Sequence, residues 1–297
     1  MTYSISTISK ILTGDTSSPL EDLAITELII DSRKLSYPES ALFFALNSSR
    51  RDGHDFIGAA YAAGVRAFVV SRTLPEQDYP QAVFLHVSDP LQALQKLAAH
   101  HRSRFSYPVI GITGSNGKTV VKEWLYQLLN RDFSIVRSPR SYNSQIGVPL
   151  SIWEMDEDHT LGIFEAGISL PGEMEKLAEI IRPTIGVLTQ IGAAHDEGFS
   201  SRAVKATEKR KLFEGASIPE PIEVADRVVE GGMTRITDRG GEVIVIPFTD
   251  EASVQNALNV GNYTSIAITF VTSYFLVKNI LPEYWIVELI MAQLGWI

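Results

Sequence analysis

The chain has 297 residues, of which 45% are hydrophobic and 21% are charged, and its formal net charge is −9. This composition is typical of an ordinary globular protein, and the length predicts about two domains. The acidic balance argues against a nucleic-acid partner, which would need basic residues to neutralise phosphates. The absence of cysteine excludes disulfides, zinc–thiolate sites and a cysteine nucleophile.

Two features of the sequence bear on localisation. The N-terminus has no basic segment followed by an apolar core, so no signal peptide is predicted. The longest apolar run, Ser265–Val277, is too short and too interrupted to span a bilayer. We therefore expect a cytoplasmic protein without a membrane span.

Residues 1–103 alternate strand-like and helix-like segments and predict a small α/β domain. Four apolar runs are strand candidates: Glu27–Ile30, Ala41–Leu46, Ala67–Val70 and Ala82–Val87. Helices are predicted over Phe56–Ala63 and from Pro90 to His101, where proline takes the first helical position. The polar segment Ser103–Tyr107 marks the boundary, so that residues 104–297 form a second domain.

Two polar clusters stand out in this first domain. Asp31-Ser32-Arg33 directly follows a predicted strand, and Arg51-Asp52-Gly53-His54 precedes a predicted helix. Both are compatible with plain solvated turns, since loops are normally polar. Alternatively, their serine and glycine N–H groups and arginine suit a negatively charged, hydroxyl-rich ligand such as a nucleotide-sugar diphosphate.

The second domain opens with a loop of small residues, Thr113–Thr119 (TGSNGKT), between an apolar β-branched run and a helical pattern. A strand, a glycine loop, Lys-Thr and a helix form the arrangement that holds a nucleotide triphosphate. Lys118 is expected to reach the β- and γ-phosphates, and the Thr119 hydroxyl to bind magnesium. The usual P-loop spacing is not met, because glycine would be required at Ile112. An ordinary βα turn is the alternative.

Further candidates follow the next strands of this domain. Glu165 ends the predicted strand Leu161–Phe164, and His195 comes shortly after Thr184–Thr189. Ligands of open α/β sheets gather at the carboxyl ends of the strands, where a glutamate is a natural magnesium ligand. A surface glutamate and a structural or exposed histidine are the alternatives.

The last part of the chain is less informative. Ala203–Phe213 is predicted to form a charged helix on which Lys205 and Lys209 share a face, and plain solvation is expected for both. The pattern weakens after Glu214. A strand is predicted at Glu242–Ile246, followed by an apolar helical region that begins near residue 250.

Several of these sites occur in the order and spacing of one family. The segments Thr113–Thr119, Tyr142–Leu150 (YNSQIGVPL), Glu165–Gly167 (EAG), Gly192–His195 (GAAH), Lys209–Phe213 (KRKLF) and Gln255–Leu258 (QNAL) resemble motifs of the Mur ligase central domain. In the first domain, Asp31–Arg33 and Arg51–Ile57 resemble the UDP-binding domain of two members. The resemblance implies a UDP-substrate domain followed by a P-loop ATPase domain with a mostly parallel sheet.

The resemblance also implies site residues, with ATP and Mg²⁺ as cofactors. The ATP-binding set is Thr113, Gly114, Ser115, Asn116, Gly117, Lys118, Thr119, Asn143 and Asn256. The magnesium set is Thr119, Glu165, His195 and Lys209, and Lys118, His195 and Lys209 are the catalytic residues. Lys209 matches a lysine that the family carbamylates, which turns a cation into an anionic oxygen ligand. The UDP-substrate set is Ser32, Arg33, Asp52, Gly53 and His54.

The segment that ends in Gln255–Leu258 most resembles the branch that adds D-alanyl-D-alanine, in a version fused to an alanine racemase in some bacteria. The implied reaction joins D-alanyl-D-alanine to UDP-N-acetylmuramoyl-tripeptide through an acyl phosphate, in peptidoglycan precursor synthesis. The alternatives are a third-residue-adding ligase and a non-catalytic nucleotide-binding remnant. The family has a third domain, which we expect to be absent from these 297 residues and to act as a fused or separate partner.

Overall fold

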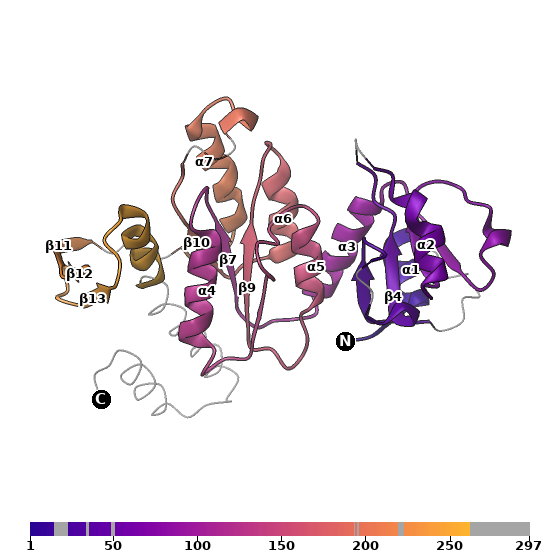
Figure 1. Ribbon diagram of the computed structural model, residues 1–297, viewed down its shortest axis with the longest axis horizontal. Coiled ribbons are helices and arrows are strands. Elements are labelled where there is room, and N and C mark those ends of the chain that lie inside the picture. The colour runs from indigo at the N-terminus through magenta and orange to yellow at the C-terminus, as the bar shows by residue number, and fades with distance from the viewer. Residues whose placement is uncertain are drawn as a thin grey trace. The chain divides into compact units, whose positions relative to one another are not determined.

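The computed structural model describes residues 1–14, 23–33, 36–48, 51–192, 194, 196–218 and 223–261 (Figure 1). The chain divides into two compact units, of which the first consists of Met1–Phe105 and Gln145–Glu157. The second consists of Ser106–Ser144 and Asp158–Ile297. Each unit contains a parallel sheet with helices, so the predicted α/β class is confirmed.

The sheet of the first unit has four parallel strands. Their order is β3 (Glu27–Ile29), β4 (Ala41–Phe44), β5 (Ala67–Val70) and β6 (Val83–His86). The helices of this unit are α1 (Ile5–Thr13), α2 (Ile57–Ala62), α3 (Pro90–Arg102) and α5 (Gly147–Trp153). A short strand β1 (Tyr3–Ser4) pairs antiparallel with β2 (Ala24–Ile25). Each predicted strand of this domain is present.

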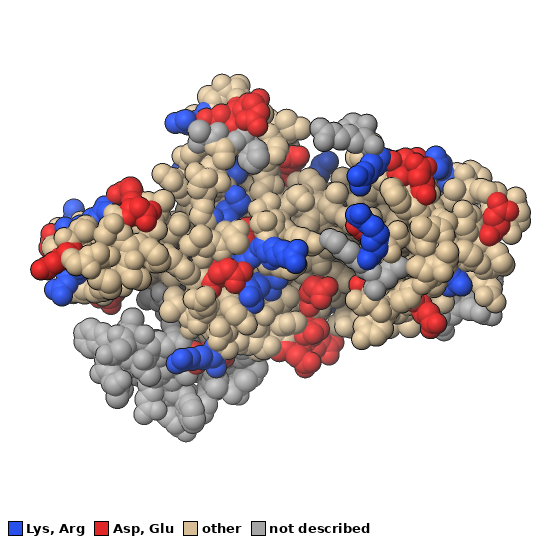
Figure 2. Space-filling model, viewed as in Figure 1, with Lys and Arg blue, Asp and Glu red and all other residues tan. Residues whose placement is uncertain are grey.

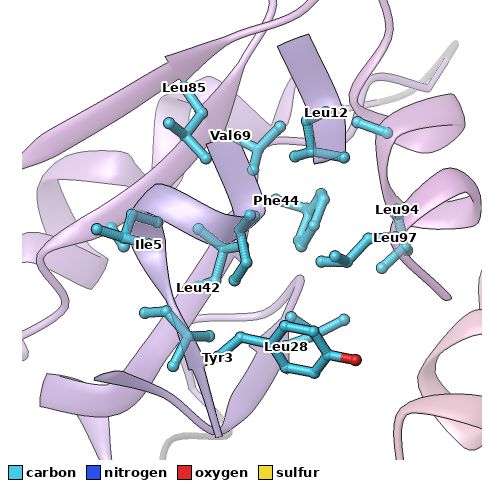
Figure 3. Close-up of a cluster of buried hydrophobic side chains, with 14 of the residues drawn as sticks. Tyr3, Ile5, Leu12, Leu28, Leu42, Phe44, Val69, Leu85, Leu94 and Leu97 are labelled. Atoms are coloured by element: carbon cyan, nitrogen blue, oxygen red, sulfur yellow. The ribbon is translucent and has the colours of Figure 1, made fainter. Parts of the chain in front are cut away.

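Both faces of this sheet are covered, because successive strand residues point to opposite sides. Leu42 and Phe44 of β4 lie in a core with residues of α1 and α3, such as Ile5 and Leu94 (Figure 3). Phe43, between them, belongs to the other core, which includes residues of α2. Burial on both faces explains why these strands are continuous apolar runs rather than alternating ones.

The sheet of the second unit also has four parallel strands. Their order is β10 (Ile185–Leu188), β7 (Val109–Thr113), β9 (Leu161–Ala166) and β8 (Ile135–Arg137). The helices of this unit include α4 (Lys118–Leu129), α6 (Glu173–Ile181) and α7 (Arg202–Arg210), and α7 continues into the 3₁₀ turn η5 (Lys211–Phe213). The predicted helix Ala203–Phe213 is thus α-helical only to Arg210.

Strand β7 is central in this sheet and carries the small-residue loop at its carboxyl end. Ile110 and Ile112 pack in one core with Val121 and Leu125 of α4. Gly111 faces the other way, where a β-carbon would lie 2.8 Å from Pro183 Cβ and 3.5 Å from Leu212 Cδ2. Gly111 is therefore required for packing, which explains a glycine outside the usual phosphate-loop position.

A small antiparallel sheet follows in the second unit, in the order β11 (Val224–Glu230), β12 (Met233–Asp238) and β13 (Val243–Ile246). Residues 251–261 are helical, and this helix packs against β12 and β13 through Val254, Ala257, Ile236 and Ile246. Strands β11 and β12 were not predicted, and all residues of β11 are exposed. The predicted apolar segment Ser265–Val277 lies outside the described residues.

Within the part of the chain that the structure describes, no helix has the length and apolar character needed to cross a bilayer. On the face shown in Figure 2, basic and acidic side chains are interspersed.

Candidate functional site

The loop between β7 and α4 has a backbone that depends on its two glycines. Gly114 has φ 148° and Gly117, which precedes α4, has φ 84°. A β-carbon on Gly114 would overlap the Thr189 hydroxyl, and one on Gly117 would overlap the Asn256 side-chain oxygen. The strand–loop–helix arrangement is therefore confirmed, and Asn256, far away in sequence, lies against the loop.

Hydrogen bonds connect the loop to the segment that follows β10. Ser115 N donates to Gln190 O at 2.8 Å, and the Thr189 hydroxyl donates to Asn116 O at 2.6 Å. The N-terminus of α4 lies next to these contacts, where the first helical N–H groups have no partner within the helix. A helix N-terminus of this kind favours an anion, which is the property that a phosphate-binding loop needs.

Lys118 bends back over this loop. Its Nζ donates to Gly114 O at 2.9 Å and lies 3.5 Å from Ser115 O. Burial lowers the pKa of Lys118, and the nearby Glu165 carboxylate opposes that shift. Among the described residues its hydrogen-bond acceptors are main-chain oxygens, so this ammonium is suited to bind an incoming phosphate.

Glu165 is completely buried at the end of β9, so the interpretation as a surface glutamate is wrong. Its Oε2 accepts hydrogen bonds from Thr119 Oγ1 at 3.1 Å and Asn143 Nδ2 at 3.4 Å. Its Oε1 is buried and accepts no hydrogen bond from the described residues. The fold thus brings together Thr119, Asn143 and Glu165, three residues predicted from separate motifs.

These oxygen atoms fit a magnesium ion. Mg²⁺ prefers carboxylate and hydroxyl oxygens and is usually held by one or two carboxylates plus substrate phosphates. Thr119 Oγ1 and the Glu165 carboxylate are such donors, and Glu165 Oε1 is a buried acceptor without a hydrogen bond. His195, the third predicted ligand, lies outside the described residues.

Lys122 is a residue of this site that sequence reasoning missed. Its side chain is fully buried, with Nζ 3.0 Å from Glu165 Oε1, outside hydrogen-bond geometry, and 3.2 Å from Glu123 Oε1. Nζ also donates to Ser138 O at 2.8 Å and to Arg140 O. The available signal was its spacing, since Lys122 follows Lys118 by four residues and therefore lies on the same face of α4.

The two lysines of α7 are buried, so the expectation of plain solvation is wrong. Lys205 is fully buried and donates to Gly192 O, to Ala194 O at 3.2 Å and to Asp196 Oδ1. Lys209 is 2% exposed. Burial, together with the positive charges of Lys118 and Lys205, lowers the pKa of Lys209 to about 8. Lys209 is therefore close to Lys118.

The polar clusters of the first unit follow the carboxyl ends of neighbouring parallel strands. Ser32 and Arg33 follow β3, where Arg33 forms a bidentate ion pair with Asp31 at 2.9 and 2.8 Å and is largely exposed. Arg72, which sequence reasoning missed, follows β5 and pairs with Asp52 at 3.0 Å. Parallel strands bring these residues to one edge of the sheet, where ligands bind in α/β folds.

His54 is buried rather than solvated. Its Nε2 accepts from Ser71 N at 3.0 Å, so its Nδ1 carries the proton and donates to Asp52 Oδ1 at 2.6 Å. Asp52 also accepts from His54 N at 2.9 Å, and these bonds lower the pKa of Asp52. Asp52 and His54 thus fix the turn, while Arg33 and Arg72 remain the cations of this edge.

Gly53 provides a direct test of this turn. A β-carbon there would lie 2.5 Å from Leu46 N and 2.6 Å from Leu46 O, so the main chain must shift. We expect Gly53→Ala to lower the free energy of unfolding by about 1–3 kcal/mol, measured by urea denaturation. Gly58→Ala is the matched control, because that β-carbon would meet only the Tyr79 hydroxyl at 3.9 Å. In helix α2 it is expected to stabilise by up to about 1 kcal/mol. Equal effects of the two substitutions would contradict the prediction.

Comparison with protein families gives two matches. A model of the Mur ligase middle domain matches residues 112–280, and a model of the Mur ligase family, catalytic domain, matches residues 24–102. Together they cover most of both units.

Curated relatives extend beyond this chain. The UDP-N-acetylmuramoyl-tripeptide--D-alanyl-D-alanine ligase of Bacillus subtilis (strain 168) is 34% identical over 212 residues, which make up 71% of this chain and 46% of that protein. The Escherichia coli (strain K12) protein of the same name is 33% identical over 220 residues, 74% of this chain and 46% of the relative. The chain spans less than half the length of these relatives.

Solved structures share the fold. MurF from Acinetobacter baumannii matches with a TM-score of 0.78 and 22% identity, over 89% of this chain and 65% of that chain. The MurF ligase from Thermotoga maritima, in complex with ADP, matches with a TM-score of 0.69 and 24% identity, over 81% of this chain and 63% of that one. At these identities the likeness establishes the architecture.

Proposed function

This chain belongs to the Mur ligase family, and on that basis we propose that it forms the substrate-loading part of a D-alanyl-D-alanine-adding ligase. The middle-domain model alone covers more than half of the chain, which confirms the family that the motifs indicated. The proposed substrates are ATP, UDP-N-acetylmuramoyl-tripeptide and D-alanyl-D-alanine. The names of the curated relatives support this branch of the family.

The observation that carries the proposal is the buried Glu165 carboxylate beside the phosphate loop. Thr119 of the loop donates to Glu165 at 3.1 Å, and Lys118 lies close enough for Glu165 to influence its pKa. A cation for phosphate oxygens and hard oxygen ligands for magnesium thus lie together, as phosphoryl transfer requires. We assign Lys118 and the loop N–H groups to ATP, and Thr119 and Glu165 to Mg²⁺.

In the proposed reaction, the terminal carboxylate of the tripeptide attacks the γ-phosphate of ATP and gives an acyl phosphate and ADP. The amine of D-alanyl-D-alanine then displaces phosphate and forms the amide bond. Bound magnesium would neutralise charge on the transferring phosphoryl group. Lys118 would stabilise the same charge by hydrogen bonding, and no protein nucleophile is needed.

The remaining predicted residues take roles consistent with their places. Asn143, which donates a hydrogen bond to Glu165, is assigned to the phosphates of ATP. Asn256, which lies beside Gly117, is assigned to the nucleotide. The carboxyl edge of the first unit is assigned to the UDP group, with Arg33 and Arg72 as cations for its diphosphate. Asp52, Gly53 and His54 shape that edge, and His195 is proposed as a further magnesium ligand.

Lys209 is proposed to be carbamylated, and its pKa makes this testable. Only a neutral amine attacks CO₂, and with a pKa of about 8, roughly a tenth of the Lys209 side chains are neutral at pH 7 and about nine-tenths at pH 9. At constant dissolved ¹³CO₂ we therefore expect a carbamate ¹³C signal that grows between pH 7 and 9. The signal should be absent in Lys209→Arg and present in Lys176→Arg, a surface control. A pH-independent signal would contradict the assignment.

A half-reaction assay tests the proposed function. Hydroxylamine traps an acyl phosphate as a hydroxamate, so the chain incubated with ATP, Mg²⁺ and UDP-N-acetylmuramoyl-tripeptide should give a hydroxamate that depends on all three. Addition of a separately produced third domain and D-alanyl-D-alanine should then give the amide. The competing function is that of a non-catalytic nucleotide-binding remnant. It predicts nucleotide binding with neither product, and that result would overturn the ligase assignment.

A further inference from the structure

The buried ion pair of Lys122 and Glu165 has no role in the function proposed so far. Lys122 Nζ lies 3.0 Å from Glu165 Oε1, and both side chains are completely buried. We propose that Lys122 is a built-in counter-ion that prevents divalent cations from binding at Glu165 until nucleotide phosphates are present. This inference rests on the proposed nucleotide site, because Glu165 and the phosphate loop are its two halves.

The position of Lys122 is fixed by more than its charge partner. Its Nζ donates to two main-chain oxygens of the segment after β8, Ser138 O at 2.8 Å and Arg140 O. Arg140 has a left-handed backbone with φ 50°. Because the ammonium is held from this side, it faces Glu165 without depending on a bound ligand.

The local charge balance disfavours a free divalent cation. Glu165 carries one negative charge, which faces Lys122 at 3.0 Å and also acts on the Lys118 ammonium. Glu123, which lies 3.2 Å from Lys122 Nζ, also pairs with Arg137 at 3.1 Å, and Asp196, before α7, pairs with Lys205 and Arg202. Fixed charges in a buried site interact strongly because water screens them little. Among the described side chains, and with Lys209 unmodified, a divalent ion that approaches Glu165 therefore meets at least as much positive as negative charge.

The small number of potential metal ligands also disfavours cation binding without nucleotide. Among the residues that the structure describes, no group of three or more His, Cys, Asp or Glu side chains is placed to hold a metal ion. Magnesium commonly completes its coordination with substrate phosphates. Phosphate oxygens would supply both the missing ligands and the missing negative charge, so metal and nucleotide should bind with strong positive coupling, which is reciprocal by thermodynamic linkage.

The experiment measures this coupling on the full chain, with Mn²⁺ as the probe and its electron paramagnetic resonance signal as the readout. The Mn²⁺ dissociation constant is determined without nucleotide and with a saturating non-hydrolysable ATP analogue. The coupling is the ratio of these two constants. Analogue binding is measured separately by calorimetry in the absence of metal.

Three variants separate charge from packing. Lys122→Gln removes the charge but keeps donors for the Ser138 and Arg140 carbonyls, and is expected to tighten nucleotide-free Mn²⁺ binding and lower the coupling by at least about tenfold. Lys122→Arg keeps the charge and should retain the coupling. Lys176→Gln removes a charge from the exposed face of α6 and should leave the coupling at the wild-type value.

Unchanged coupling in folded Lys122→Gln would overturn the inference, since a lysine that only holds the 138–140 segment would alter stability alone. If Lys122→Gln does not fold, the inference is tested on the wild type alone, by comparing its Mn²⁺ dissociation constants without and with the analogue. Nucleotide-free Mn²⁺ binding as tight as binding with the analogue would overturn the inference, and binding at least about 100-fold weaker supports it. Failure of the wild type to bind the analogue at all would instead reject the proposed nucleotide site.

Discussion

Lys118→Ala is expected to weaken binding of a magnesium–ATP analogue by about 100-fold. Among the described residues, the Lys118 ammonium donates to main-chain oxygens of its own loop, chiefly Gly114 O at 2.9 Å. A phosphate would replace these acceptors with charged ones, and hydrogen bonds to charged groups contribute about 1.5–3 kcal/mol each. Loss of about 2.7 kcal/mol corresponds to the expected factor.

The measurement is calorimetric titration of the full chain with the analogue and Mg²⁺. Lys176→Ala serves as the control for loss of a lysine, because Lys176 lies on the exposed face of α6. Binding of UDP-N-acetylmuramoyl-tripeptide should be unchanged in Lys118→Ala, since that ligand is assigned to the first unit. An affinity within about threefold of wild type would contradict the role of Lys118.

Glu165→Leu is expected to lower the free energy of unfolding by about 3–5 kcal/mol, because it removes the fully buried carboxylate that faces Lys122 and leaves this ammonium only the partly exposed Glu123 carboxylate. Lys122→Met should lower the free energy of unfolding by a similar amount, because it leaves the buried Glu165 carboxylate without the Lys122 ammonium. The double variant replaces the ion pair by apolar side chains and should be much less destabilised than the sum of the single variants. Urea denaturation of the four proteins measures the cycle.

Non-additivity is the critical result of that cycle. A coupling energy of about 2 kcal/mol or more indicates that the two charges stabilise one another. Destabilisations that simply add would show that Lys122 and Glu165 act through separate contacts, such as the Ser138 and Thr119 hydrogen bonds. The Lys122–Glu165 ion pair would then make no net contribution to the free energy of unfolding.

The sequence allowed prediction of those features that depend on local pattern. Apolar β-branched runs predicted the parallel strands, and small residues between a strand and a helical stripe predicted the loop around Gly114 and Gly117. Placing Glu165 and the loop at one sheet edge needed only the rule that parallel strands share their carboxyl edge. These predictions succeeded because each rests on a few neighbouring residues.

Buried charges escaped prediction because their environment is created by distant segments. Lys122 is held by carbonyls 16 and 18 residues further along the chain, and Lys205 by the turn before α7. Lysine is normally solvated, so residue type alone favoured the wrong expectation for Lys205 and Lys209. The β11–β12 hairpin was missed because all of β11 is exposed and carries no buried face to set a period.

The most direct test of the proposed function is a calorimetric titration of the full chain, first with UDP-N-acetylmuramoyl-tripeptide and then with the magnesium–ATP analogue. We predict one site for each ligand, with the nucleotide site lost in Lys118→Ala and the precursor site retained. Nucleotide binding without precursor binding would move the chain to another branch of the family. A folded chain that binds neither ligand would contradict the account.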